Sequence, residues 1–477
     1  MGSALRILVV GVFFTGCALL PVKYPDYRAL LGDSKSPAGK TVFRDARVFT
    51  ATSGEVLEHQ DVWVSGSTIE EISPTDSSRT AEVEIDAKGK LLMPGLVDVH
   101  VHTTATSLPP WYLAMPDSKH NLEAFLYAGI TTVNDLGGAL EDVGTLRNEV
   151  ADGTRRGPRI FFAGPIITAR GGYPASLIGE YGVLASAAIT DKICTQVTTP
   201  KEATDAVLRR VSGGATIIKI VVADIPNGAP RLTEETIAAV VKEAHAHGLK
   251  VAAHIDDASD ALLCAKLGVD LLAHGVITSA LTPDEAKTLA AAKMVMVPTM
   301  VNYERFAQIA QKRYTPLQLT IDTEPKLSLE QFAPKYVDAA TLTPGFFKWG
   351  DEIEAHVKTR PVNVKTALEA GVQIVVGSDA MGSVGTFAPD IHHELELLVA
   401  AGMPNVDALL GATSRAAKVL MDKPHFGTIE VGKSADLLLV DGDPLTEISA
   451  TQKIVVVMAR GKTVQRNLPS PKPPQQP

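Results

Sequence analysis

The chain has 477 residues, of which 45% are hydrophobic and 21% charged, and its formal net charge is −9. This composition is ordinary for a globular protein, and the length is enough for a large core and more than one domain. There is no basic run and no helix with a lysine and arginine face, so nucleic acid is not expected as a partner.

The first twenty residues have the pattern of an export signal. Arg6 precedes the apolar run 7–14, which is too short for a membrane span and is followed by Thr15-Gly16-Cys17. That ending resembles the lipobox of bacterial lipoproteins, in which the cysteine carries the lipid. We therefore expect a signal or lipoprotein segment at 1–20 and a tether at 21–38. The protein would be exported, either periplasmic or anchored to the membrane through Cys17. The alternative is a hydrophobic N-terminal strand.

Short β-rich segments separated by turn residues occur near both ends of the chain. Five of them lie between residues 41 and 85, and strand character returns at 427–440 and 453–457. We therefore expect 39–92 and 425–465 to form one composite β-sandwich domain. The proline-rich residues 466–477 are expected to be a disordered tail.

Between these segments, apolar strands alternate with helical patterns. The strands are expected at 96–101, 129–136, 159–165, 216–222, 249–254, 270–274, 294–298 and 372–379. The clearest helix is 233–248, with Thr233 as its cap and Gly248 as its stop, and another is expected at 405–421. Eight strands in alternation favour a (β/α)8 TIM barrel of the α/β class at 93–424 over an open doubly wound sheet.

One connection, 299–371, is too long for a simple loop between the seventh and eighth strands. We call it the insert and expect a lid or specificity element at the barrel mouth, with helices at 303–313 and 351–369. Phe346, Phe347 and Trp349 could line a substrate pocket there or simply pack the insert onto the barrel.

Polar side chains close several of the apolar strands, and in a (β/α)8 barrel these strand ends face the active site. Strand side chains two apart point to the same side, so His100 and His102 can both ligate one metal ion. The later strands contribute Lys219, His254, His274 and Asp379. Taken singly, these could be buried histidines or, for Asp379, a helix N-cap. Together they indicate a site for zinc or a similar ion.

Lys219 is unusual because it lies between isoleucines on an apolar strand. Burying a lysine is costly unless it is paired or modified. One interpretation is an ion pair with a nearby acid. The other is a carbamate formed with CO2, because a desolvated lysine exposes the neutral amine that this reaction needs.

The chain resembles the amidohydrolase superfamily over about residues 40–465. The motifs are PGLVDVHVH (94–102), IIKI (217–220), VAAH (251–254), LLAHG (271–275), VVGSDA (375–380) and GTIEVGKSADLLLVDGDPL (427–445). The resemblance implies two divalent metal ions, with zinc as the first candidate. His100, His102 and Asp379 would hold one ion, and His254 and His274 the other. Carbamylated Lys219 and a hydroxide would bridge them, with Asp379 as the proton shuttle.

Within the superfamily, the chain looks most like the imidazolonepropionase-related and prolidase-like branch, which resembles dipeptidases for Xaa-Pro or Xaa-Arg bonds and hydrolases of N-acyl amino acids. Residues 255–257 depart from the Ala-His-Gly that relatives often have there, so the pocket on that side is expected to differ. Arg170 and Tyr173 are candidates for binding a substrate carboxylate, although Arg170 could equally be a surface arginine.

We therefore predict a metal-dependent hydrolase that cleaves an amide bond, most simply in a dipeptide or an N-acyl amino acid. Three alternatives stay open: a mononuclear deaminase of the same superfamily, a cyclic amide or lactone hydrolase, and a non-catalytic exported binding protein stabilised by metal. The sequence does not decide the oligomeric state, and a homo-oligomer is compatible with it.

Overall fold

The computed structural model describes residues 27–32, 39–109, 112, 116–178, 190–225, 228–337, 356–382 and 384–468. The expected signal segment 1–20 with Cys17, the aromatic residues Phe346, Phe347 and Trp349, and most of the tail 466–477 lie outside these residues. Within the described ranges, no helix combines the length and the apolar character needed to cross a bilayer.

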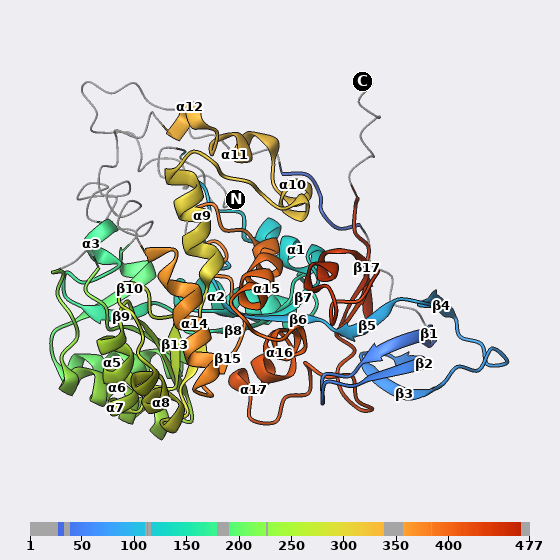
Figure 1. Ribbon diagram of the computed structural model, residues 1–477, viewed down its shortest axis with the longest axis horizontal. Coiled ribbons are helices and arrows are strands. Elements are labelled where there is room, and N and C mark those ends of the chain that lie inside the picture. The colour runs from blue at the N-terminus through green and yellow to red at the C-terminus, as the bar shows by residue number, and fades with distance from the viewer. Residues whose placement is uncertain are drawn as a thin grey trace, which may run out of the picture.

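Strands from both chain ends share one eight-stranded sheet, and the composite sandwich stays a prediction. Its order is β18-β17-β16-β5-β1-β2-β3, with β4 paired to β1. β5 links the two ends, because it runs parallel to β1 and antiparallel to β16. The bounds are β1 Thr41–Phe49, β2 Val56–Ser65, β3 Thr68–Pro74, β4 Val83–Asp86, β5 Leu91–Pro94, β16 Leu437–Val440, β17 Ile454–Ala459 and β18 Lys462–Val464. In Figure 1, β1 to β4 lie to one side of the parallel strands.

All eight predicted parallel strands are present, in two sheets. One sheet contains β6 Leu96–Val101, β7 Ile130–Asp135 and β8 Arg159–Phe162. The other has the order β10-β9-β11-β12-β13-β14-β15. Its strands are β9 Ile166–Ala169, β10 Cys194–Val197, β11 Ile217–Val221, β12 Lys250–His254, β13 Leu271–Ala273, β14 Val295–Val297 and β15 Gln373–Ile374. The prediction missed β9 and β10, which pair with each other after the third predicted strand.

Backbone hydrogen bonds join the two parallel sheets at both edges. The amide of Thr216, just before β11, donates to the carbonyl of Phe162 at the end of β8 (2.8 Å). At the other edge, Val99 of β6 donates to Val376 (3.2 Å), and Val101 bridges Ala380 in parallel register. The fold is therefore α/β with parallel strands. The assigned strand pairs do not form one continuous ring.

Helices alternate with the parallel strands. The longer ones are α1 Ser118–Tyr127, α2 Leu140–Ala151, α5 Pro200–Ser212, α6 Glu234–Ala246, α7 Ala258–Leu267, α8 Pro283–Ala291, α9 Met300–Ala310, α14 Thr359–Glu369, α15 Ile391–Ala400, α16 Asn405–Gly411 and α17 Ser414–Leu420. Short segments are α3 Ala175–Ile178, α10 Gln318–Thr323, α11 Lys326–Glu330, α12 Pro334–Val337, and the 3-10 turns η3 Ala388–Asp390 and η4 Ile448–Gln452. Thr233 caps α6 as predicted, because its hydroxyl accepts from the amide of Thr236 (3.2 Å).

The single helix expected at 405–421 was wrong, since the structure has α16 and α17 with a break between them. The carbonyls of Gly411 and Ala412 accept hydrogen bonds from the amides of Val376 and Val97 instead of continuing the helix. The break therefore joins α16 and α17 to β6 and to the segment that follows β15.

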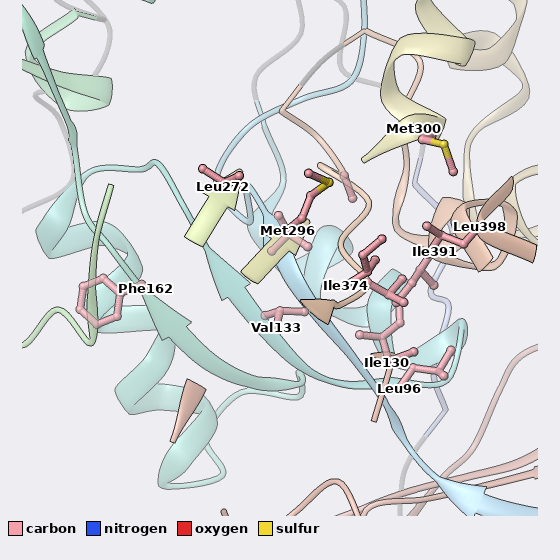
Figure 2. Close-up of a cluster of buried hydrophobic side chains, with 14 of the residues drawn as sticks. Leu96, Ile130, Val133, Phe162, Leu272, Met296, Met300, Ile374, Ile391 and Leu398 are labelled. Carbon is pink, nitrogen blue, oxygen red and sulfur yellow. The ribbon is translucent and has the colours of Figure 1, made fainter. Parts of the chain in front are cut away.

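A continuous apolar core lies between the strands and the surrounding helices (Figure 2). Residues from both parallel sheets meet helical residues there: Leu96, Ile130, Val133, Phe162, Leu272, Met296, Met300, Ile374, Ile391 and Leu398. Each is buried, so the strand ends that carry the polar residues are held by packing on both sides. The helices α9 to α12 of the insert lie along one edge of the molecule, above α14 and α15 in the view of Figure 1.

Candidate metal centre

His100, His102 and Asp379 meet at one point. His100 is on β6, and His102 is the first residue after that strand. Asp379 comes from the segment that pairs with β6. The Nε2 atoms of His100 and His102 lie 3.3 Å and 3.1 Å from Oδ1 of Asp379. One ligand atom from each of the three side chains can be chosen so that all lie within 4.8 Å of one another, which is the spacing that a shared metal ion requires.

The backbone around Asp379 fixes this geometry. Asp379 has a left-handed conformation (φ 55°), and its amide donates to the carbonyl of His100 (2.8 Å). Asp98 braces the same junction, because its carboxylate accepts from the amides of His100 and Ser378 and from the Ser378 hydroxyl. A Cβ at Gly382 would collide with Oδ1 of Asp379 and the ring of His102, so only glycine fits there.

His254 and His274 extend this group. The ring centroids of His254 and His274 are 4.3 Å apart, and those of His274 and His100 are 4.9 Å apart. His254 ends β12, and His274 follows β13 in a left-handed conformation (φ 74°). The four imidazoles from three strands therefore form one contiguous cluster.

Lys219 faces the same cluster from β11. It is buried, and its Nζ has no hydrogen-bond partner. Burial lowers the pKa of Lys219 to about 7, opposed only in part by the charge of Asp379. Burial, together with the nearby charge of Lys219, also holds the pKa of His100 and His254 below the usual range. Neutral imidazoles and a neutral amine are the forms that ligate a metal or react with CO2.

The donor set fits divalent metal ions. Lys219 Nζ, His254 Nε2 and Asp379 Oδ1 are buried without a hydrogen bond, a costly condition that a bound ion would relieve. Two of the histidines are oriented by a contact at Nδ1. His102 Nδ1 is 2.9 Å from the carbonyl of Gly137, and His274 Nδ1 is 2.7 Å from the Thr299 hydroxyl. Such contacts leave Nε2 to point into the cluster.

The two tentative substrate contacts lie in different environments. The ring of Tyr173 packs against His254, with centroids 4.9 Å apart, so Tyr173 borders the cluster. Arg170 is exposed, and its Nε donates to the Thr198 hydroxyl (3.2 Å). The structure gives Arg170 no contact with the histidines.

The sequence analysis missed four residues of the insert. Asn302 donates from Nδ2 to Oδ2 of Asp379, and Thr299 holds His274. The ring of Tyr303 meets His274 edge-on at 5.6 Å, and the guanidinium of Arg360 lies 3.6 Å from the centre of the Tyr303 ring. For Thr299, Asn302 and Tyr303, the sequence offered one signal, their position, because residues 299–303 directly follow the seventh predicted strand.

A separate cavity of about 720 Å³ opens at the opposite ends of the strands. Its lining includes the first residues of β12 to β15, which are Lys250, Leu271, Val295 and Gln373. None of the six predicted ligands does, so this cavity lies away from the candidate centre.

Comparisons with known proteins point to one family. The model of the amidohydrolase family matches residues 91–464 of the chain. An uncharacterised protein of Mycobacterium tuberculosis is 28% identical over 239 residues, which are 49% of this chain and 53% of that protein. The chain thus spans about half the length of this curated relative.

Two longer similarities cover most of the chain. The imidazolonepropionase of a Geobacillus strain is 24% identical over 434 residues, 86% of this chain and 89% of that enzyme. A solved Xaa-Pro dipeptidase with methionine bound in its active site superimposes with a TM-score of 0.72 at 26% identity, covering 89% of this chain and all of that one.

Proposed function

Because the chain belongs to the amidohydrolase family, we propose that it is a metal-dependent hydrolase that cleaves the amide bond of a dipeptide or an N-acyl amino acid. The observation that carries the proposal is the cluster of four imidazoles around an unpaired buried lysine and a carboxylate. The likeness to an Xaa-Pro dipeptidase over nearly the whole chain supports this substrate class.

The proposal includes the architecture that this chemistry needs. The parallel strands would close into a (β/α)8 barrel at 93–424, with the insert at 299–371 over its mouth. The eight-stranded sheet would fold into a composite sandwich at 39–92 and 425–465. Export, with a lipid on Cys17, belongs to the same proposal and is tested by labelling cells with a radioactive fatty acid and comparing wild type with Cys17→Ser.

Members of this family generally use divalent metals, and the residues present fit two of them. His100, His102 and Asp379 would hold one ion and His254 and His274 the other, with Lys219 as a bridging carbamate. Zinc is the first candidate, because imidazole and carboxylate ligands suit it. When bound, such ions supply Lewis acidity toward the scissile carbonyl and toward water.

The chain's own residues would handle the protons. Asp379 would accept a proton from the attacking water on its carboxylate and deliver it to the amine nitrogen as the carbon–nitrogen bond breaks. Asn302 donates to Oδ2 of Asp379, so Oδ1 stays directed at His100 and His102. Tyr173 and Tyr303 lie against His254 and His274, where they would exclude water from one side of the pocket.

The test is a substrate screen combined with metal analysis. The purified protein, loaded with zinc, manganese or cobalt, is assayed against libraries of dipeptides and N-acyl amino acids, and its metal content is measured. We expect two ions per chain and release of a free amine. Lys219→Ala should lose an ion together with the activity. Full activity of Lys219→Ala with one ion would instead favour a mononuclear deaminase, and metal binding without any hydrolysis would favour a binding protein.

A further inference from the structure

Arg360, on α14, differs from the other buried arginines. Three arginines are buried in the part of the chain that the structure describes: Arg210, Arg305 and Arg360. All three guanidinium nitrogens of Arg210 donate to carbonyl or hydroxyl oxygens, and those of Arg305 to Asp390, Gln308 and a backbone carbonyl. Nε and Nη2 of Arg360, by contrast, have no acceptor.

One aromatic ring separates this guanidinium from the candidate metal centre. Its central carbon lies 3.6 Å from the centre of the Tyr303 ring, and that ring meets His274 at 5.6 Å. Asn302, the neighbour of Tyr303, binds Asp379. Arg360 therefore lies one ring away from the candidate metal centre, on the side of His274, and α14 lies below α9 in the view of Figure 1.

The charge on Arg360 is incompletely compensated. Burial lowers its pKa only to about 10, so the side chain is a cation at neutral pH. The Tyr303 ring covers a face of the guanidinium, but a cation–π contact does not satisfy the N–H groups, which lie in the plane of the group. The carboxylates of Asp256 and Glu394 act on Arg360 from a distance, and neither forms an ion pair with it. A buried cation with unused in-plane donors suits an incoming anion.

We propose that Arg360 binds the free carboxylate of the substrate, next to the amide bond that is cleaved. This inference rests on the proposed function and assigns the residue that recognises the carboxylate of those substrates, which follows the scissile amide by one carbon atom. In a dipeptide or an N-acyl amino acid, a single α-carbon joins the nitrogen of the scissile amide to the carboxylate. The forked guanidinium would hold both carboxylate oxygens while the amide lies at the centre.

The assignment excludes substrates that lack this carboxylate. Carboxamides, esters, lactones and internal peptide bonds would all leave Arg360 buried and unpaired, so they should bind poorly. It also assigns the carboxylate to a residue of the insert, whereas Arg170 is exposed and bound to Thr198.

The test compares acids with their matched amides. The metal-loaded protein is assayed with twenty N-acetyl amino acids, a set of Xaa-Pro dipeptides and the carboxamides of both. Hydrolysis is measured directly, and binding is measured by the rise in Tm. Wild type should prefer the best acid over its amide by at least about 100-fold in kcat/KM, with the difference mainly in KM. In Arg360→Gln this preference should fall to near one, and Arg360→Lys should retain part of it.

Arg305→Lys is the matched control, because it alters a buried arginine of the same insert that has its own acid partner. Its acid-to-amide ratio should equal that of wild type. Equal hydrolysis of acids and amides by wild type, or an unchanged ratio in Arg360→Gln, would overturn the inference and leave the proposed function standing.

The binding measurement decides the inference even without turnover. If acids raise the Tm of wild type but not of Arg360→Gln, and nothing is hydrolysed, the carboxylate site stands and the proposed reaction fails. If no acid raises the Tm of wild type more than its amide does, and none is hydrolysed in preference to its amide, the carboxylate site is rejected.

Discussion

Asn302 donates a hydrogen bond from Nδ2 to Oδ2 of Asp379, and this contact joins α9 of the insert to the carboxylate beside His100 and His102. Both residues are buried, so water cannot readily replace the bond. The insert is therefore part of the candidate centre, and it determines which oxygen of Asp379 faces the histidines.

Removal of this contact should slow the reaction. We expect Asn302→Ala to reduce kcat by about 10- to 100-fold, the range typical of residues that orient metal ligands, with a smaller change in KM. Steady-state kinetics checks this, and metal analysis shows whether the ions stay bound. Gln308→Ala, on the same helix and bonded to Glu304, is the control and should keep the wild-type kcat. Equal kcat for Asn302→Ala and wild type would mean that Asp379 needs no such support.

Activity should also depend on carbon dioxide. Lys219 is buried, its Nζ lacks a partner, and burial lowers its pKa to about 7, which favours the neutral amine that forms a carbamate. Metal-free protein reloaded in CO2-free buffer should therefore regain little activity until bicarbonate is added. Lys219→Ala should lose more than about 100-fold in kcat and show no response to bicarbonate. Full recovery of wild type in CO2-free buffer would contradict the carbamate.

A charged histidine fastens α15 to α9, and its effect should depend on pH. His393 lies 3.2 Å from Glu304 and 3.0 Å from Glu396. Burial opposes its charge, but hydrogen bonds to these two carboxylates outweigh burial and raise the pKa of His393 to about 9. Because the folded pKa lies above the unfolded value of about 6.5, the stabilisation is fully present below pH 6.5 and is lost as the pH rises through 9.

Urea denaturation of wild type and His393→Gln at several pH values measures this stabilisation. The difference in the free energy of unfolding should be on the order of 2 kcal/mol at pH 6 and should approach zero above pH 9.5. His245→Gln, at an exposed histidine bonded to Asp270, provides the comparison for a surface pair and should differ from wild type by less than about 1 kcal/mol. If the difference in the free energy of unfolding between wild type and His393→Gln does not change with pH, packing rather than charge is the source of the stabilisation.

The strands and the residues at their ends could be predicted because the local sequence determines them. The apolar, β-branched run 217–221 has the composition of a buried parallel strand and forms one, and a histidine or lysine in such a run stands out. The six residues named from these runs lie around one cluster. That they bind metal stays a prediction.

The remaining features depend on contacts between distant segments. Asn302 and Arg360 occur in helical patterns, where asparagine and arginine usually face solvent, but both are buried here, against Asp379 and Tyr303 respectively. The break between α16 and α17 depends likewise on the amides of Val97 and Val376, which lie more than thirty residues away. Such features require the folded arrangement of several elements, which the periodicity of one segment does not contain.

Arg360 and Arg305 should respond in opposite ways to the same substitution in ligand-free protein. Arg305 is paired with Asp390 at 2.8 Å, so Arg305→Gln leaves a buried carboxylate without its partner and should cost about 3–5 kcal/mol of stability. Arg360 has unused donors, so Arg360→Gln removes a charge that is costly to bury and forfeits about 1–2 kcal/mol of contact with Tyr303. We expect Arg360→Gln to be as stable as wild type or more stable, as judged by Tm and urea denaturation without substrate. Functional groups commonly carry such a cost, which the substrate offsets when it binds. If Arg360→Gln is destabilised as strongly as Arg305→Gln, Arg360 has a structural role, and the carboxylate site must be sought elsewhere in the pocket.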